Sequence, residues 1–207
     1  QHPDHSSALA TPFAVQVSHD DRYLYVTAAG SDVFAVLDAA TGAELGRCAA
    51  GAVPQGISIE YAAGQPVSAW VLNAAANSVT RIDLRDPRNP QPAPEIVLID
   101  PTDTAVKRGR IAFSTARAST TGTFSCASCH PDGHTDQLLW VLATPIVTGG
   151  NQIMPRSTMP VRGLRDTAPF HWDGIPGDPY GGIHSGSIHA SVAPNSQLDS
   201  PESSTRH

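Results

Sequence analysis

The sequence predicts a protein in two parts, a mainly β N-terminal part followed by a loop-rich, partly α-helical C-terminal part. Three observations lead to this expectation. The first hundred residues contain short apolar runs, rich in β-branched and aromatic residues, separated by Gly, Asp and Ser turns. The pattern occurs twice, with a spacing of 42 to 45 residues. Beyond residue 101 the alternation stops, and a Cys-x-x-Cys-His motif follows at residues 126–130.

Composition limits the classes of function. The 207 residues are 40% hydrophobic, which is enough for a core, and carry a net charge of −6. Nucleic-acid binding would need a basic stripe, so it is not expected. No run of 18 apolar residues is present, and we expect no transmembrane segment. The chain starts at Gln1 without a Met or an apolar leader, as expected of a processed or partial chain.

The first copy of the β pattern spans about residues 12–53. An apolar run that starts at Pro12 is followed by a polar turn at Ser18–Asp21, and later turns fall at Gly30–Asp32 and Ala39–Gly42. The segments between these turns predict four short strands, at residues 12–17, 22–27, 33–38 and 44–48.

The second copy spans about residues 54–99. Pro54–Ile59 repeats Pro12–Val17 at an offset of 42, whereas Ser68–Asn73 and the strand ending at Asp83 repeat their counterparts at 45. An insertion of three residues near 62–65 accounts for the change. A period of 40 to 45 residues with several strands per unit is typical of β-propeller blades. Residues 1–100 are therefore expected to form a partial β-propeller of about two blades, with a β-sandwich as the alternative.

Less regular structure is expected after the second copy. Residues 86–94 contain four prolines and predict a linker, and residues 96–99 predict a last strand. Residues 107–118 fit a short helix, residues 135–142 show a second helical pattern, and the rest of residues 122–190 predict loops. We assign residues 101–190 to a second domain and residues 191–207 to a tail or the start of a continuation.

The motif Cys126-Ala-Ser-Cys129-His130 is the attachment signal for c-type haem. Two thiols one helical turn apart can each bind a vinyl group of the porphyrin, and the adjacent His130 then reaches the iron as the proximal ligand. One covalent haem would also serve as a core for a loop-rich domain. The alternatives are a thioredoxin-like redox pair, half of a zinc site, or chance.

Two resemblances to known families extend this interpretation. Tyr25–Ala28 and Trp70–Asn73, each followed by an apolar strand that ends in Asp, resemble the YVTN-type β-propeller repeat. Residues 108–117, 126–133 and 160–174 resemble the cytochrome domain of the di-haem cytochrome c peroxidase superfamily, in the branch where it follows such a propeller. Members with two haems carry two Cys-x-x-Cys-His motifs, and this chain carries one. A complete peroxidase unit therefore cannot be assigned to this chain alone.

The sixth ligand of the iron would decide between electron transfer and catalysis. Met159 is the first distal candidate, and His171 and Met154 are the alternatives. His134 lies too close to His130 to reach the opposite face of the same porphyrin. His184 and His189 fall in a Gly- and Ser-rich stretch with no argument for ligation.

Other residues are expected to support the cofactor. Guanidinium groups pair well with carboxylates such as haem propionates. Trp172 and Trp140 could pack on the porphyrin, and Asp173 and Asp178 offer a weaker possibility of calcium binding. Cys48 lies in a strand and is expected to be a buried thiol. The four arginines that flank the haem motifs are Arg110, Arg117, Arg162 and Arg165.

Three functions follow from these expectations. The first is a c-type cytochrome that transfers electrons, with the propeller as a scaffold or docking surface. The second is a peroxidase-like oxidoreductase whose second haem lies outside this chain, and the third is a propeller-based binding module with a structural haem. No catalytic residue is assigned, and the partners would be other redox proteins or haem subunits, within a larger assembly or a longer chain. Covalent haem attachment implies a periplasmic or extracellular bacterial location.

Overall fold

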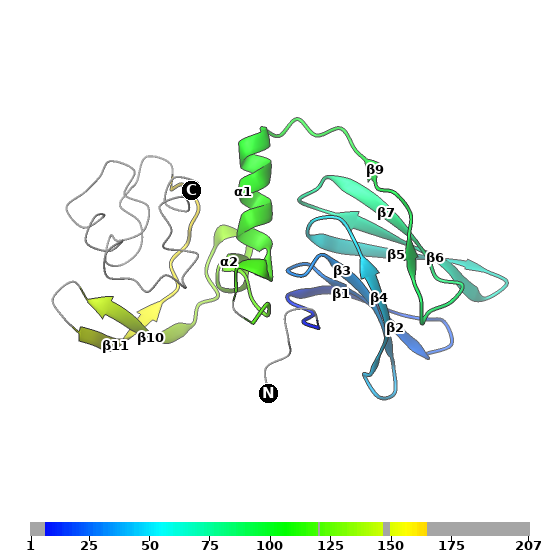
Figure 1. Cartoon of the computed structure of the whole chain (residues 1–207), viewed down its shortest axis with the longest axis horizontal. Coiled ribbons are helices and arrows are strands. Elements are labelled where there is room, and N and C mark those ends of the chain that lie inside the picture. The colour runs from blue at the N-terminus through cyan, green and yellow to red at the C-terminus, as the bar shows by residue number, and fades with distance from the viewer. Residues whose placement is uncertain (1–6, 120, 147–149, 165–207) are drawn as a thin grey trace. The chain divides into compact units, whose positions relative to one another are not determined.

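The computed structural model describes residues 7–119, 121–146 and 150–164, and it divides the chain into two compact units, Gln1–Cys126 and Ala127–His207 (Figure 1). The boundary predicted at residue 100, between the β part and the second domain, rests on sequence motifs and stays a prediction. No helix of the described residues is long and apolar enough to cross a membrane.

The first unit contains a four-stranded antiparallel sheet made by the first copy of the repeat. We call it the first sheet. Each strand pairs with the next one along the chain, so the sheet is a meander. All four strands predicted for the first copy are confirmed to within one residue. They are β1 (Pro12–Val17), β2 (Tyr23–Ala28), β3 (Val33–Asp38) and β4 (Glu44–Ala49).

The second copy of the repeat forms a second antiparallel sheet, which we call the second sheet. Its strand order is β5-β6-β7-β8, and β9 also pairs with β7. The mainly β character of this part is confirmed, while its described residues form two sheets and no closed propeller. The strands are β5 (Pro54–Ala62), β6 (Gln65–Asn73), β7 (Ser78–Asp83), β8 (Gln91–Pro92) and β9 (Ile96–Val97).

The three-residue insertion lengthens one hairpin. β5 and β6 have nine residues each, against six in β1 and β2. A two-residue turn at Ala63–Gly64, with φ of +49° and +80°, joins the longer strands. In the first sheet the turn is wider, and the Ser18 hydroxyl accepts hydrogen bonds from the backbone N–H groups of Arg22 and Tyr23 at 3.1 and 3.0 Å.

The core of the first unit lies between the two sheets. Tyr25, Phe34 and Val36 of the first sheet pack with Ala69, Val71, Ile82 and Leu84 of the second, and all seven side chains are fully buried. Ile57 and Ile59 of β5 pack against the same cluster. Because each buried side chain of this size contributes about 1.5–3 kcal/mol, this apolar contact is the main source of stability in the unit.

The helix α1 (Thr104–Ser114) covers one end of both sheets. Asp103 caps it by accepting the backbone N–H of Ala105 at 2.8 Å. Ile111 packs against Ala29, which follows β2, and Ala75, which follows β6. The helix therefore lies across equivalent turns of the two sheets.

Polar contacts hold α1 in the same position. The Lys107 ammonium group donates to the backbone carbonyl of Ala76 at 2.7 Å and lies 2.9 Å from Asp100 Oδ2. A short 3₁₀ helix, Ala116–Ala118, follows α1, and its Ala116 N–H donates to the Gly30 carbonyl at 2.7 Å. Lys107 is the single lysine of the chain.

The second unit contains a β-hairpin of β10 (Leu139–Ile146) and β11 (Gly150–Ser157), paired from Leu139↔Ser157 to Ile146↔Gly150. The helix predicted at residues 135–142 is therefore wrong, as is the expectation of loops only beyond it. Aromatic and β-branched residues from Trp140 onward favour a strand, and Pro145 cannot continue a helix. The sequence does not predict the partner strand β11, because Pro155 interrupts its alternating pattern.

The hydroxyl group of Tyr25 provides a test of the core. It is buried and has no hydrogen-bond partner among the described residues, and burial raises its pKa. A buried hydroxyl without a partner costs about 1–3 kcal/mol. We expect Tyr25→Phe to raise the free energy of unfolding by about 1 kcal/mol, measured by urea denaturation. Tyr25→Ala should lower it by about 3–5 kcal/mol. A clear loss of stability in Tyr25→Phe would show that the hydroxyl is satisfied by a bound water.

The Lys107–Asp100 pair predicts a dependence of stability on pH. The hydrogen bond from Lys107, with further ones from Thr102, lowers the pKa of Asp100 from 3.8 to about 2. A lowered pKa stabilises the fold above pH 3.8, and this contribution is lost as the pH falls towards 2. In Lys107→Met, the difference in unfolding free energy from the wild type should therefore shrink over this window. Arg108→Met removes a neighbouring exposed cation, and its difference in unfolding free energy from the wild type should not shrink over this window.

Candidate functional site

The Cys-x-x-Cys-His motif forms one turn of helix and the residue after it. The helix α2 (Cys126–Cys129) begins and ends at the two cysteines, which places them on the same side of the helix, three residues apart. His130 leaves the helix with φ −116° and ψ 63°. This local geometry fits the requirement for two thiols along one edge of a planar cofactor, with an imidazole beside them.

The segment that follows His130 is a tight turn. The Gly133 N–H donates to the His130 carbonyl at 2.9 Å, and Asp132 and Gly133 both have left-handed backbone conformations, with φ of +52° and +73°. A side chain at Gly133 would lie 3.1 Å from Cγ of Arg162, so glycine is required there for two reasons.

Residues after the hairpin hold this turn in place. Arg162 Nε donates to the Asp132 carbonyl at 2.7 Å, and the Val161 N–H donates to the Gly133 carbonyl at 2.8 Å. The structure thus brings Arg162, one of the predicted arginines, to the loop directly after His130. Its guanidinium fixes backbone, a role that the expectation of propionate binding did not include.

The electrostatics of Cys126 weaken the redox-pair alternative. Burial raises the pKa of the Cys126 thiol. A nucleophilic cysteine of a thioredoxin-like pair needs the opposite shift, a pKa lowered by positive charge or a helix N-terminus. The three cysteines form no disulfide, and the described residues contain no group of three or more His, Cys, Asp or Glu side chains that could hold a metal ion. A closed zinc site is therefore not formed by the described residues.

The second unit exposes large apolar side chains near the motif in the sequence. Leu138 is 53% exposed, Leu139 67% and Trp140 40%. Met159, the first distal candidate, is 36% exposed. Apolar side chains in this number are available to pack on a flat apolar cofactor, so the described residues of this unit fit a haem better than a polar ligand.

Trp140 is oriented by a carboxylate. Its indole N–H donates to Asp136 Oδ2 at 2.9 Å, and the Asp136 N–H donates to the Cys129 carbonyl at 3.0 Å. Burial alone would raise the pKa of Asp136, but hydrogen bonds from the Leu138 N–H at 2.9 Å and the Trp140 indole outweigh it and the pKa is lowered. Asp136 therefore stays ionised near neutral pH and links Trp140 to the end of α2.

The other predicted arginines of the described residues lie in the first unit. Arg110 is exposed on α1. Arg117 is 78% exposed at its side chain, and its guanidinium lies 3.9 Å from Asp32 Oδ2. Neither arginine is withdrawn into the core, so both remain available to a carboxylate ligand.

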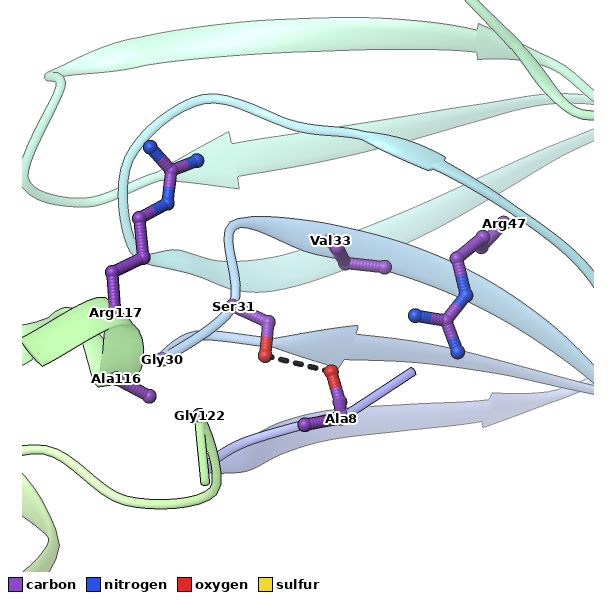
Figure 2. Close-up of a pocket in the computed structure, with 8 residues that line it drawn as sticks. All are labelled: Ala8, Gly30, Ser31, Val33, Arg47, Ala116, Arg117 and Gly122. Atoms are coloured by element: carbon purple, nitrogen blue, oxygen red, sulfur yellow. Dashed lines mark hydrogen bonds between the residues drawn. The ribbon is translucent and has the colours of Figure 1, made fainter. Parts of the chain in front are cut away.

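A pocket of about 220 Å³ lies beside Arg117 (Figure 2). Arg47 of β4 also lines it and is held by the Glu44 carboxylate and the Ser7 carbonyl. A hydrogen bond from the Ser31 hydroxyl to the Ala8 carbonyl, at 2.9 Å, joins two of the lining residues. Sequence reasoning missed Arg47, because nothing in the pattern of β4 distinguishes it from an ordinary exposed arginine. The lining residues are Ala8, Gly30, Ser31, Val33, Arg47, Ala116, Arg117 and Gly122.

Several predicted site residues are not placed. Met154 lies in β11 opposite Leu142 in register, and its side chain is outside the description. The remaining ones lie outside the described residues, and their roles stay predictions. They are Arg165, His171, Trp172, Asp173, Asp178, His184 and His189.

Comparison with known proteins gives weak similarity to solved structures only. No protein-family model matches the chain, and no curated protein matches it. Among solved structures, the chain is similar to hydrazine synthase from Kuenenia stuttgartiensis, with 23% sequence identity and a TM-score of 0.39. The match covers 48% of this chain and 26% of that chain, so it spans about a quarter of the other protein. Functional inference therefore rests on this chain's own residues.

Cys48 of β4 is partly buried and packs against the core between the two sheets, and its thiol provides a test of this packing. Burial raises its pKa from 9.0 to about 12. Because only the thiolate reacts with alkylating agents, Cys48 of the native protein should react about 1000-fold more slowly at pH 8 than an ordinary cysteine. Mass spectrometry after timed iodoacetamide treatment measures the rate, and urea-unfolded protein is the control. Rapid alkylation of native Cys48 would contradict its packing against the core.

Proposed function

We propose that this protein is a c-type cytochrome that transfers electrons through one covalently bound haem. The observation that carries the proposal is α2, a single helical turn that begins at Cys126, ends at Cys129 and is followed directly by His130. The exposed apolar side chains of the second unit support it.

The residues of the motif would each have a defined role. Cys126 and Cys129 would form thioethers by adding S–H across vinyl double bonds, with sulfur bound to one carbon and the proton to the other. Nothing is oxidised or reduced in this addition. His130 would bind the iron from the proximal side, and the hydrogen bond from Arg162 to the Asp132 carbonyl would steady the turn behind it. A haem held in this way supplies a one-electron Fe(III)/Fe(II) couple.

The two sheets are proposed to be blades of a β-propeller of the YVTN type. Their equivalent strand order, their repeat of 42 to 45 residues and their face-to-face apolar packing support this assignment. The blades would act as a scaffold or docking surface, and α1 would connect them to the haem segment. We also propose a periplasmic or extracellular location, since haem c is attached there.

A single motif favours an electron carrier over the peroxidase-like alternative. Peroxidase chemistry in the di-haem family that the sequence resembles uses two haems, and this chain has one Cys-x-x-Cys-His motif. The sixth ligand of the iron, on the distal side, would complete the assignment. Met159 is the candidate for that position whose side chain the structure describes.

Haem attachment is tested by substitution of the motif. In a host that attaches haem c, the chain should retain haem on a denaturing gel, and Cys126→Ser combined with Cys129→Ser should abolish the haem stain. Cys48→Ala is the matched control because Cys48 lies in β4, outside the motif, and it should keep the stain. Loss of stain in the control, or haem retained by the double variant, would refute the assignment.

Absorption spectra of the same protein distinguish the two redox functions. A low-spin ferric spectrum that peroxide does not change indicates an electron carrier. Met159→Leu should then remove the methionine-to-iron charge-transfer band while the haem stain persists. A high-spin ferric spectrum with peroxide turnover would support the peroxidase-like alternative instead.

A further inference from the structure

One face of the first sheet is apolar and exposed along β1, although Val26 and Ala35 at the centre of the same face are buried. Val15 and Val17 of β1 are 64% and 47% exposed, and no described residue covers them. Val17 pairs across the strands with Leu24, which pairs with Leu37, so these side chains share a face. We call Val15, Val17, Leu24 and Leu37 the front face of the first sheet.

The internal repeat shows what covers such a face. At the offset of 42 residues, Val15 and Val17 correspond to Ile57 and Ile59 of β5. In the second sheet these two isoleucines are not exposed, because they pack against the cluster that contains Tyr25 of the first sheet. A front face of this type is thus covered by the opposite face of another sheet, one that carries aromatic and β-branched residues.

The second sheet has an uncovered face of that kind. At the offset of 45, Trp70, Leu72 and Val79 correspond to Tyr25, Thr27 and Phe34 of the first sheet. Tyr25 and Phe34 belong to the cluster against which Ile57 and Ile59 pack. Leu72 is 44% exposed and pairs with Val79 on the same face. We call Trp70, Leu72 and Val79 the back face of the second sheet.

A charged pair borders the back face. The guanidinium of Arg81 lies 5.7 Å from the ring centroid of Trp70 and 4.0 Å from Glu60, and it donates to the Ser68 hydroxyl at 2.7 Å. Trp and Arg are the residues most enriched where protein interfaces gain most of their energy. Glu60 and Ser68 both stay beside Arg81 when a neighbouring chain packs on Trp70. Docking therefore leaves the guanidinium of Arg81 paired.

We propose that the front face of one copy of this chain docks on the back face of a second copy. The contact repeats, between copies, the sheet-on-sheet packing that already joins the two sheets within each chain. The two surfaces differ, so the interface is heterologous, and a regular rotation from copy to copy closes it into a ring. Two to four copies would give about four to eight sheets, the range of closed propellers. The inference does not depend on the haem.

The experiment measures the oligomeric state of the full chain by sedimentation and light scattering. The wild type should form a closed oligomer of two to four copies. Val15→Lys with Val17→Lys changes the front face, and Leu72→Lys changes the back face, each at exposed positions that should leave the circular dichroism spectrum unchanged. Each variant alone should be monomeric at concentrations at which the wild type assembles. Its dissociation should occur at a concentration at least about tenfold higher than that of the wild type. Val106→Lys, at a 51% exposed position on α1, is the matched control and should assemble as the wild type does.

A mixture of the two variants gives the decisive result. The intact front face of the Leu72→Lys chain should bind the intact back face of the other variant, so the mixture should form a 1:1 dimer that cannot grow. A monomeric wild type would overturn the proposal, since another polypeptide or another segment would then have to cover the front face. Assembly that survives Leu72→Lys, or a mixture that stays monomeric, would overturn it as well.

Discussion

The apolar contact between the two sheets is the interaction on which the rest of the first unit depends. Tyr25, Phe34 and Val36 on one side meet Val71, Ile82 and Leu84 on the other, and neither sheet could bury these side chains alone. The contact also sets the turns after β2 and β6 near each other, where Ile111 packs against Ala29 and Ala75. The placement of α1 is thus a consequence of how the sheets pack, and the chain that leaves α1 towards Cys126 starts from a fixed point.

The two units are stabilised by different means. The first has a contiguous apolar core, whereas the described part of the second has a hairpin, one helical turn and several exposed apolar side chains. Backbone hydrogen bonds around Gly133 and the contact of Arg162 with Asp132 give the second unit local order. Under the proposed function, covalent attachment would supply the missing apolar contacts, so the cofactor would be a structural element as well as a redox centre.

Sequence reasoning succeeded where the signal was local and repeated. The strands of the first unit follow alternating apolar residues and Gly, Asp or Ser turns, and two copies of one pattern reinforce each other. It failed at residues 139–157, because a hairpin depends on pairing between two segments, and Pro155 obscured one of them. Arg47 and the pocket beside Arg117 were equally out of reach, since they result from the meeting of β4, the residues before β1 and the 3₁₀ helix after α1.

The predicted arginines illustrate the same limit in the site. Their proximity to the motif in the sequence was informative for Arg162, which contacts the turn after His130, but the atom it contacts is a backbone carbonyl. Such a contact follows from the left-handed conformation of Asp132 and Gly133, which composition does not reveal. The spacing of Cys126 and Cys129, in contrast, needs only one turn of helix, and the structure forms that turn.

Lys107 has a consequence beyond its ion pair. Because it is the single lysine of the chain, a lysine-specific protease has one cleavage site, and that site lies within α1 between the two sheets and the Cys-x-x-Cys-His motif. The ammonium group is engaged by Asp100 and Ala76, and proteases need an extended backbone, so cleavage requires α1 to open locally. Cleavage at this single site would therefore report how often α1, the segment between the two sheets and the motif, unfolds locally.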